Sequence, residues 1–167
     1  MKILFLTGRE VNYPVNRTIL YSMQQKNEVD IIDEYGSGKS IVKRSVLVFL
    51  KALPKLLNKK YDLIFIGFYG HFLMPIIRIF TNVPILFYPF ISTYETLIFD
   101  RKKASPNSLV ARLSYTLDYK AFQAADHLLL DTQANVNYFS NLFNISKNRF
   151  SYVFLGADEN LFTPRQI

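Results

Sequence analysis

The feature of this chain that most limits its fold is a regular alternation of short apolar runs with longer stretches of helical periodicity. The apolar runs, rich in β-branched and aromatic residues, predict strands at residues 3–7, 28–32, 62–66, 84–88, 127–131 and 150–155. Most are apolar at every position, which is typical of strands covered on both faces of a parallel sheet. The intervening stretches predict helices at residues 14–26, 41–59, 71–80, 106–124 and 133–143. This order predicts a three-layer α/β domain with a mostly parallel sheet of about six strands.

Length and composition exclude several classes of protein. The chain has 167 residues, the size of one domain, and 50% of them are hydrophobic, which excludes a disordered polar chain. It has no cysteine and two histidines, so disulfides and thiolate metal sites are excluded and we expect no bound metal. No apolar run approaches the ~20 residues that span a bilayer. The N-terminus has too short an apolar core for a signal peptide, so we expect a cytoplasmic protein.

Positive charge, +7 in total, is concentrated in one predicted helix. No acidic residue occurs between positions 36 and 61, while Arg44, Lys51, Lys55 and Lys59 share one helical face. Solvated faces usually mix both signs of charge. We therefore favour contact with an anionic membrane surface, at the inner face of the cell membrane, over an ordinary solvated face. No groove-binding motif accompanies these residues, so nucleic acid is the weakest candidate partner.

Ligands of parallel α/β sheets bind beyond the carboxyl ends of the strands, and polar residues occur at several of these ends. The first predicted strand leads into Gly8 and Arg9, where a ligand could approach the backbone and an arginine could pair with a phosphate. A tight turn with a solvated arginine explains these residues equally well. His71 follows the third strand at the start of a helix, where its ring could contact a substrate oxygen or make only local hydrogen bonds.

The segment after the fourth strand is the richest in polar side chains. Ser92 and Glu95 have the spacing of a capping box, which explains part of this polarity. The cap does not explain Asp100, Arg101 and the two lysines that follow them. Long loops between a strand and a helix often carry function, so we expect this loop to form one wall of a binding site. Asp100 could orient Arg101 or accept a proton, or the two could form an exposed ion pair.

Four motifs follow one another along the chain, at residues 90–96, 100–102, 124–132 and 156–164. The last contains Gly156 and Asp158, followed by Phe162 and Pro164. In this order the motifs resemble the N-terminal domain of retaining GT-B glycosyltransferases of the family-four type, and the similarity covers essentially the whole chain. The resemblance implies that residues 1–167 form a single Rossmann-like domain, one half of a GT-B fold. It also implies that the second, donor-binding domain is absent from this chain.

In that family the first domain mostly receives the acceptor, and the second holds most of the nucleotide sugar. The resemblance implies that the loop of Gly8, beside Arg9, approaches the donor phosphates. It also implies an acceptor-binding wall made of Tyr94, Glu95, Asp100, Arg101 and Thr132. A nucleotide sugar is the implied co-substrate, with no cofactor. Many relatives carry a histidine just after the fourth strand, where this chain has Tyr88-Pro89-Phe90, so the catalytic group stays open between His71 and Asp100.

Two functions are consistent with these patterns. The first is the N-terminal, mainly acceptor-binding domain of a glycosyltransferase that moves sugar from a nucleotide sugar to a polysaccharide or lipid-linked acceptor. Such a half is expected to be inactive alone, because the cleft between two domains positions both substrates. The alternative is a non-catalytic Rossmann-like or flavodoxin-like module that binds a phosphorylated ligand or a protein partner.

Overall fold

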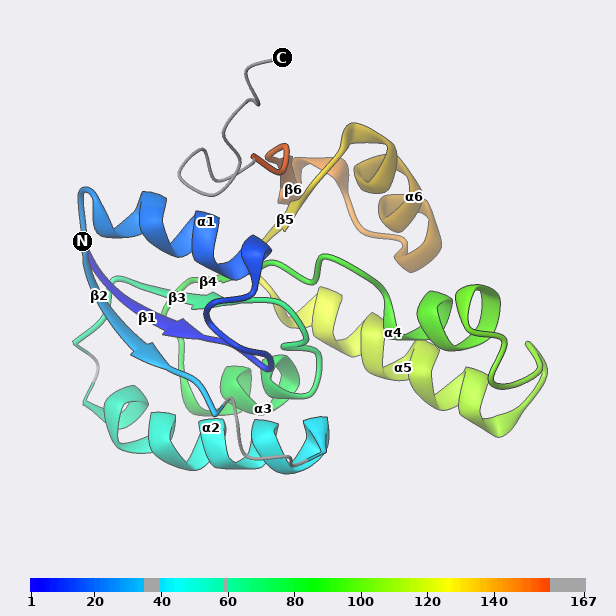
Figure 1. Ribbon diagram of the computed structural model, residues 1–167, viewed down its shortest axis with the longest axis horizontal. Helices are drawn as coiled ribbons and strands as arrows, with labels where there is room; N and C mark the ends of the chain where they lie inside the picture. Colours follow the sequence, from blue (N-terminus) through cyan, green and yellow to red (C-terminus); the bar gives the residue numbers. More distant parts are fainter. Residues whose placement is uncertain (35–39, 59, 157–167) are drawn as a thin grey trace, which may run out of the picture.

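All six predicted strands occur, and they form one sheet. The computed structural model describes residues 1–34, 40–58 and 60–156, and its strands lie in the order β2-β1-β3-β4-β5-β6 (Figure 1). Neighbouring strands are all parallel, so their carboxyl ends meet at one edge. The predicted α/β class and parallel sheet are confirmed. The bounds are β1 Lys2–Leu6, β2 Glu28–Ile32, β3 Leu63–Ile66, β4 Ile85–Phe87, β5 His127–Leu130 and β6 Phe150–Tyr152.

The predicted helices occur close to their expected positions. They are α1 Pro14–Gln24, α2 Ile41–Leu57, α3 Leu73–Phe80, α5 Leu109–Ala124 and α6 Gln133–Phe143, and a short 3₁₀ turn, η2 Lys147–Arg149, precedes β6. In α2, α5 and α6 a hydroxyl at the N-cap accepts a backbone N–H of the first turn, which fixes where each helix begins. The capping residues are Ser40, Ser108 and Thr132.

The segment after β4 differs from the predicted loop, because it begins with helical turns. The Ser92 hydroxyl accepts the Glu95 N–H at 3.0 Å, as the capping box predicts, and starts the short helix α4 Thr93–Glu95. A π-helical turn, η1 Thr96–Asp100, continues it. Two such short pieces have too few residues to show a helical period, so the sequence pattern indicates only the cap.

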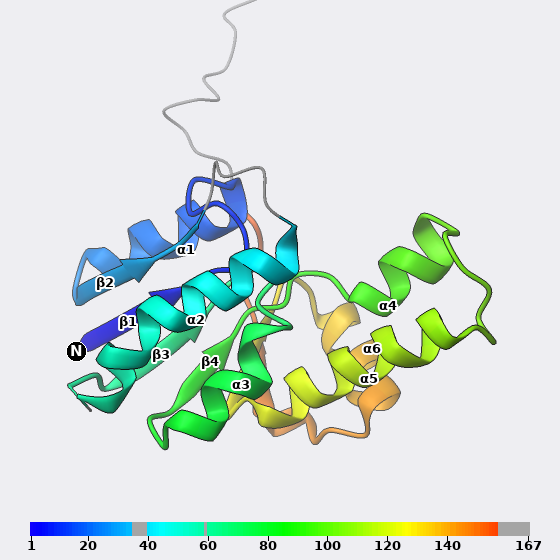
Figure 2. The same ribbon diagram turned by 90° about the horizontal axis from the view of Figure 1, so that it is seen from below.

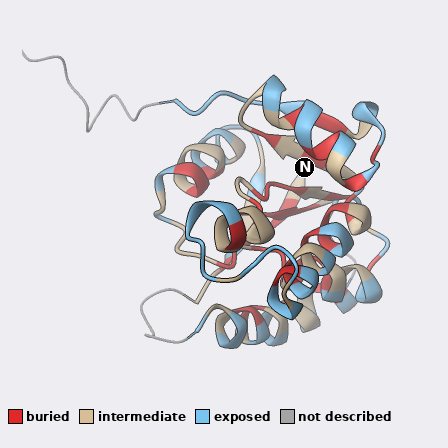
Figure 3. Cartoon of the chain, turned by 90° about the vertical axis from the view of Figure 1, so that its right-hand side faces the viewer, coloured by how far each residue is buried: buried red, intermediate tan, exposed pale blue. Residues whose placement is uncertain are grey.

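Helices cover both faces of the sheet, because alternate strand residues point to opposite sides. On one face α1 buries side chains of β1, β3 and the residue after β4, among them Ile3, Phe5, Phe65 and Tyr88. The other face carries the larger core, built with α2, α3, α5 and α6. Figure 3 shows buried residues concentrated in the strands and along the inward sides of the helices. The result is the predicted three-layer arrangement.

The chain reverses its direction across the sheet between β1 and β3. Because β1 lies between β2 and β3, the loops after β1 and β3 are neighbours at the carboxyl edge. Buried Asn16 of α1 joins them. Its amide nitrogen donates to the Thr7 hydroxyl at 2.9 Å and to the Glu10 carbonyl at 3.0 Å, and its amide oxygen accepts the Phe68 N–H at 3.0 Å. Such a switch point is where doubly wound sheets bind ligands.

We predict that Asn16→Ala lowers the free energy of unfolding by about 2 kcal/mol, because the buried Phe68 N–H loses its acceptor. Thr18→Ala is the matched control on the same helix. The Thr18 hydroxyl bonds only to the Pro14 carbonyl at 2.9 Å, near solvent, and its loss is expected to change stability by about 0.5 kcal/mol or less. Urea unfolding followed by circular dichroism measures both; equal losses would contradict a special role for Asn16.

Candidate functional site

The loops after β1 and β3 approach one another closely at the switch point. A Cβ added at Gly8 would overlap the carbonyl oxygen of Tyr69, so this contact requires glycine. Tyr69 itself has φ of 61°, a left-handed conformation that residues other than glycine rarely adopt. Gly8 therefore has a structural role, and its contact with donor phosphates stays a prediction.

Arg9 lies among aromatic rings at the same switch point. Its guanidinium carbon is 5.1 Å from the ring centre of Tyr13, 5.8 Å from that of Phe68 and 5.7 Å from that of Tyr69. Its Nε also pairs with the Glu10 carboxylate at 3.1 Å. The rings fix the position of the guanidinium by cation–π contact, and Glu10 offsets its charge. A phosphate bound there would share Arg9 with this carboxylate.

His71 lies buried below the carboxyl edge, beside an equally buried carboxylate. Its Nε2 is 3.8 Å from Oδ1 of Asp118 on α5, and its ring packs edge-on against Phe87. In the described part of the chain neither ring nitrogen has a hydrogen bond of good geometry, although the Ile91 backbone lies near enough to favour the charged ring. Burial lowers the pKa of His71 below its usual value, an effect opposed by the attraction of Asp118. The imidazole is therefore neutral at physiological pH, and it can donate or accept a hydrogen bond.

Asp118 also fixes the start of the segment that carries most predicted acceptor residues. Its Oδ2 accepts the Ser92 hydroxyl at 2.6 Å and the Tyr94 N–H at 2.9 Å, which ties α4 to α5. Asp118 is not among the site residues predicted from the sequence. A sequence pattern does indicate its burial. Asp118 is the one acid on the side of α5 that otherwise carries small and apolar residues, namely Ala111, Ser114, Ala121 and Phe122.

A cavity of about 220 Å³ brings together two predicted site residues, His71 and Arg101. It lies between the start of α2, the turn after β3 and the segment α4–η1. Its walls are mostly apolar. They are formed by Ile41, Tyr69, His71, Phe72, Thr93, Thr96, Leu97 and Arg101. The cavity therefore offers one guanidinium within a mostly apolar surface, and the His71 ring lies in its wall with both nitrogens buried.

Glu95 and Asp100 line a different, wider hollow of about 480 Å³ on the side of the segment that faces α6. Phe90, Ile91, Ser92, Thr96, Phe99, Asn135 and Phe139 complete it. Burial, together with the neighbouring Glu95 carboxylate, raises the pKa of Tyr138 to about 12. No ion pair between Asp100 and Arg101 occurs in the described chain. The two residues thus line separate hollows.

The remaining predicted acceptor residues have local structural roles. Tyr94 packs edge-on against Phe99 and Tyr115, with ring centres 5.6 Å apart in each pair. The Thr132 hydroxyl caps α6 by accepting the Asn135 N–H at 3.2 Å. The structure therefore distributes the predicted acceptor set over several surfaces. Only Arg101 of that set shares a cavity with His71.

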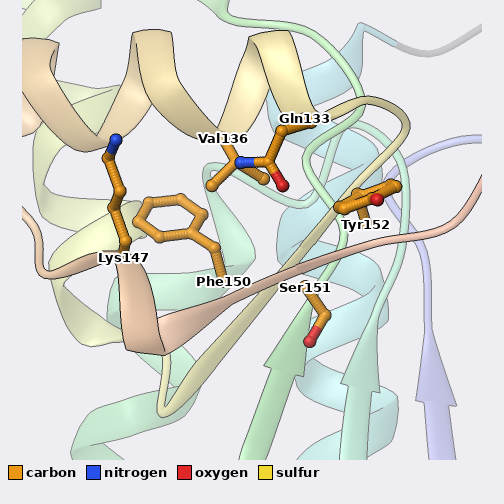
Figure 4. A pocket seen from close by; sticks show the side chains of 6 residues that line it. All are labelled: Gln133, Val136, Lys147, Phe150, Ser151 and Tyr152. Atoms are coloured by element: carbon orange, nitrogen blue, oxygen red, sulfur yellow. The ribbon is translucent and has the colours of Figure 1, made fainter.

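A further hollow, of about 430 Å³, lies at the far edge of the sheet between α6 and β6 (Figure 4). Figure 4 shows the ring of Phe150 beneath α6, with Lys147 beside it and Tyr152 at the other end. The Lys147 ammonium donates to the Asn137 amide oxygen at 2.8 Å. None of the predicted site residues lines this hollow, and we assign it no function.

The basic face predicted for α2 is partly neutralised by acids from outside the helix. Lys55 donates to Asp30 of β2 at 2.8 Å and to the Tyr61 hydroxyl at 3.2 Å, and Lys51 pairs with Glu34. The hydrogen bond from Lys55, and after it the one that the Tyr61 hydroxyl donates to the same carboxylate, lower the pKa of Asp30 below its usual value. Acids from outside the helix thus offset part of the charge of this face, which a helical period does not show, and its contact with an anionic membrane surface stays a prediction. Lys59 lies outside the described residues.

Arg44 turns partly inward on the same helix, with its Nε buried. The side that α2 presents to the core consists of Ser45, Val48, Ala52 and Leu56. Its outer side carries Lys43 and Lys51 together with exposed Val42, Val46, Leu50 and Leu57. Among the described residues, no helix is long and apolar enough to cross a membrane.

Comparison with known proteins supports the fold. No protein-family model matches the chain, and no curated protein matches it. Alr3699/HepE of Anabaena, solved in complex with UDP and glucose, is 17% identical with a TM-score of 0.51; the match covers 96% of this chain and 46% of that one. The same protein in complex with UDP is also 17% identical over the same shares, with a TM-score of 0.49. This chain thus shares a fold with just under half of Alr3699/HepE.

We predict that His71 makes the folded chain less stable as the pH falls. Its pKa is lowered in the folded state, so below the unfolded value of about 6.5 the unfolded chain binds a proton that the folded chain does not. The stability from His71 is complete above that pH and decreases below it, by at most about 1.4 kcal/mol per pH unit for one proton. Urea unfolding between pH 7.5 and 5.5 measures the slope.

The chain has two histidines, so two variants are needed to show which of them causes this pH dependence of stability. His71→Gln is expected to flatten the dependence, since the amide does not titrate. His127→Gln is the matched control: His127 contacts the Ser151 hydroxyl at 2.8 Å near the surface, and its loss is expected to leave the slope in place. Equal slopes in wild type and His71→Gln would contradict the prediction.

Proposed function

We propose that this chain is the N-terminal, mainly acceptor-binding domain of a retaining GT-B glycosyltransferase of the family-four type. In this proposal the protein moves sugar from a nucleotide sugar to a polysaccharide or lipid-linked acceptor. A second domain, outside the described chain, holds most of the donor, and no metal or cofactor takes part. The observation that carries the proposal is the cavity shared by His71 and Arg101 at the carboxyl edge of the sheet. It is supported by a fold shared with a protein solved with UDP and glucose.

The position of the cavity suits a ligand that also contacts a second domain. It opens beyond the carboxyl ends of the strands, on the side where β1 and β3 form the switch point. Ligands of doubly wound sheets lie in that region, and a partner domain facing the same edge would close over them. The donor phosphates would then lie toward Gly8 and Arg9, with the acceptor beside α4 and η1.

The chemistry of the cavity suits an acceptor with both a polar and an apolar part. Arg101 offers a planar fork of N–H donors that matches a phosphate, a carboxylate or paired hydroxyls. Leu97 and Phe72 offer apolar surface to a lipid or to the face of a sugar ring. Both ring nitrogens of His71 are buried, so the imidazole would exchange a proton or a hydrogen bond with an acceptor only if binding opened the cavity toward it; Asp118 lies close enough to orient the ring. A lipid-linked acceptor would place the protein in the cytoplasm, at the inner face of the cell membrane.

We predict that the 167-residue chain folds alone and transfers no sugar, because one half of the cleft neither holds the donor nor excludes water. Release of nucleoside diphosphate from a panel of nucleotide sugars, with simple glycosides and phospholipids as acceptors, measures this. Turnover by the purified chain would contradict the division of roles between two domains.

We predict that Arg101→Ala lowers kcat/KM for the acceptor at least tenfold, or about 1.4 kcal/mol of transition-state binding, in a protein that joins this chain to a donor-binding domain. The KM for the nucleotide sugar is expected to stay unchanged, since Arg101 lies on the acceptor side. Lys120→Ala is the matched control, because Lys120 is an exposed cation of α5 that lines no described cavity.

Two outcomes would overturn this assignment. Wild-type acceptor kinetics in Arg101→Ala would move the acceptor site toward Gly8 and Arg9. A longer protein that binds phosphorylated ligands through the same cavity, and turns over no nucleotide sugar, would identify a non-catalytic binding module instead.

A further inference from the structure

A helical arm projects from the carboxyl edge of the sheet. It consists of α4, η1 and the first half of α5, and both Figure 1 and Figure 2 show it extending away from the sheet and the other helices. The buried carboxylate of Asp118 ties its two sides together at the base, through Ser92 and the Tyr94 N–H. The far end, here called the arm tip, comprises residues 97–113.

The arm tip exposes large apolar side chains that nothing in the described chain covers. Leu109 is 70% exposed, Leu113 61%, Phe99 55% and Val110 48%. The shared exposure of Leu109, Val110 and Leu113 follows from the geometry of α5. Leu109, Val110 and Leu113 lie within about 100° of one another around the helix axis, opposite the stripe of Ala111, Ser114 and Asp118 that faces inward.

The charges of the arm tip have almost one sign. Residues 97–113 contain Arg101, Lys102, Lys103 and Arg112 against a single acid, Asp100. All four basic residues are exposed, and in the described part of the chain none forms an ion pair. Ordinary protein surfaces mix charges of both signs. On α2, by comparison, Lys51 and Lys55 both have acidic partners.

We propose that the arm tip docks on an anionic lipid bilayer. Leu109 and Leu113 enter the boundary between headgroups and acyl chains, and the nearby cations remain among the lipid phosphates. Apolar side chains bordered by long basic ones suit this interface, because the stems of Lys and Arg lie along apolar surface while their charges reach the headgroups. The proposed surface is distinct from the basic face of α2.

The charge and the exposed apolar side chains of the arm tip together favour a bilayer over other binding partners. A second copy of the chain, docked tip to tip, would bring two clusters of unpaired cations together, which is unfavourable. A nucleic acid backbone would pair with the cations but would leave Leu109 and Leu113 in water, since its phosphates offer no apolar surface. An anionic bilayer satisfies both features in one contact.

The absence of tryptophan from the sequence allows a site-specific probe. Leu109→Trp places the only indole on the arm tip, and Leu50→Trp places it on the exposed apolar side of α2 as a matched control. The 167-residue chain is titrated with vesicles of phosphatidylcholine alone and of phosphatidylcholine with phosphatidylglycerol. We expect the Leu109→Trp emission to shift to shorter wavelength, and to be quenched by brominated acyl chains, only with the anionic vesicles. Leu50→Trp is expected to change little.

Charge reversal tests the electrostatic part. Lys102→Glu with Lys103→Glu is expected to weaken partitioning of the Leu109→Trp probe at least about tenfold, and raised salt is expected to weaken it further. Lys26→Glu with Lys43→Glu, two exposed cations outside the arm, is the matched control and is expected to have a smaller effect. Urea unfolding establishes that each variant is folded, and exposed substitutions of this kind are expected to leave stability nearly unchanged.

Several results would overturn the proposal. Unchanged Leu109→Trp emission with anionic vesicles would exclude docking through the arm tip, and quenching confined to Leu50→Trp would assign it to α2. Equal binding to neutral vesicles would remove the role of the cations. Dimerisation that protects Leu109→Trp, without lipid, would identify a second copy as the occupant. The assay contains no nucleotide sugar, so these results are independent of the proposed sugar transfer.

Discussion

The carboxyl edge of this sheet depends on one buried carboxylate. Taking the charge of Asp118 out of water costs several kcal/mol unless hydrogen bonds replace the lost hydration. Its Oδ2 accepts from the Ser92 hydroxyl and the Tyr94 N–H, and His71 lies 3.8 Å from its Oδ1. These contacts fix where α4 begins and how it lies against α5. They therefore determine both the cavity beside η1 and the direction in which the arm projects.

The loops after β1 and β3, at the switch point, form the other part of the carboxyl edge. Asn16 holds the loops after β1 and β3 together, and Gly8 allows the backbone of Tyr69 to approach closely. Two residues at this edge, Tyr69 and Phe90, have positive φ although they carry large side chains. Such conformations cost free energy, and they cluster where function requires a particular backbone shape. Here they lie in the loops that follow β3 and β4, next to the two hollows that carry the candidate residues.

The sequence predicts elements well where hydrophobic burial decides them. The apolar runs predict all six strands, most clearly the inner ones that are covered on both faces, and the spacing of Ser92 to Glu95 predicts a cap. It predicts less well what depends on tertiary contacts. The pairing of Lys55 with Asp30 and the burial of Asp118 join elements that are distant along the chain. The short α4 and η1 are stabilised by such contacts as well, so no local period indicated them.

The helical turn after α4 explains why the predicted acceptor residues do not act as one group. Successive residues of a helical segment point in directions roughly 100° apart, which allows Asp100 and Arg101 to face different sides of the segment. Asp100 lines the hollow toward α6, and Arg101 lines the cavity that contains His71. The two hollows also differ chemically. The Arg101 side has a cation in a mostly apolar wall that includes the buried His71 ring, whereas the Asp100 side adds a second carboxylate, Glu95. An anionic ligand would therefore be better accommodated in the first hollow than in the second.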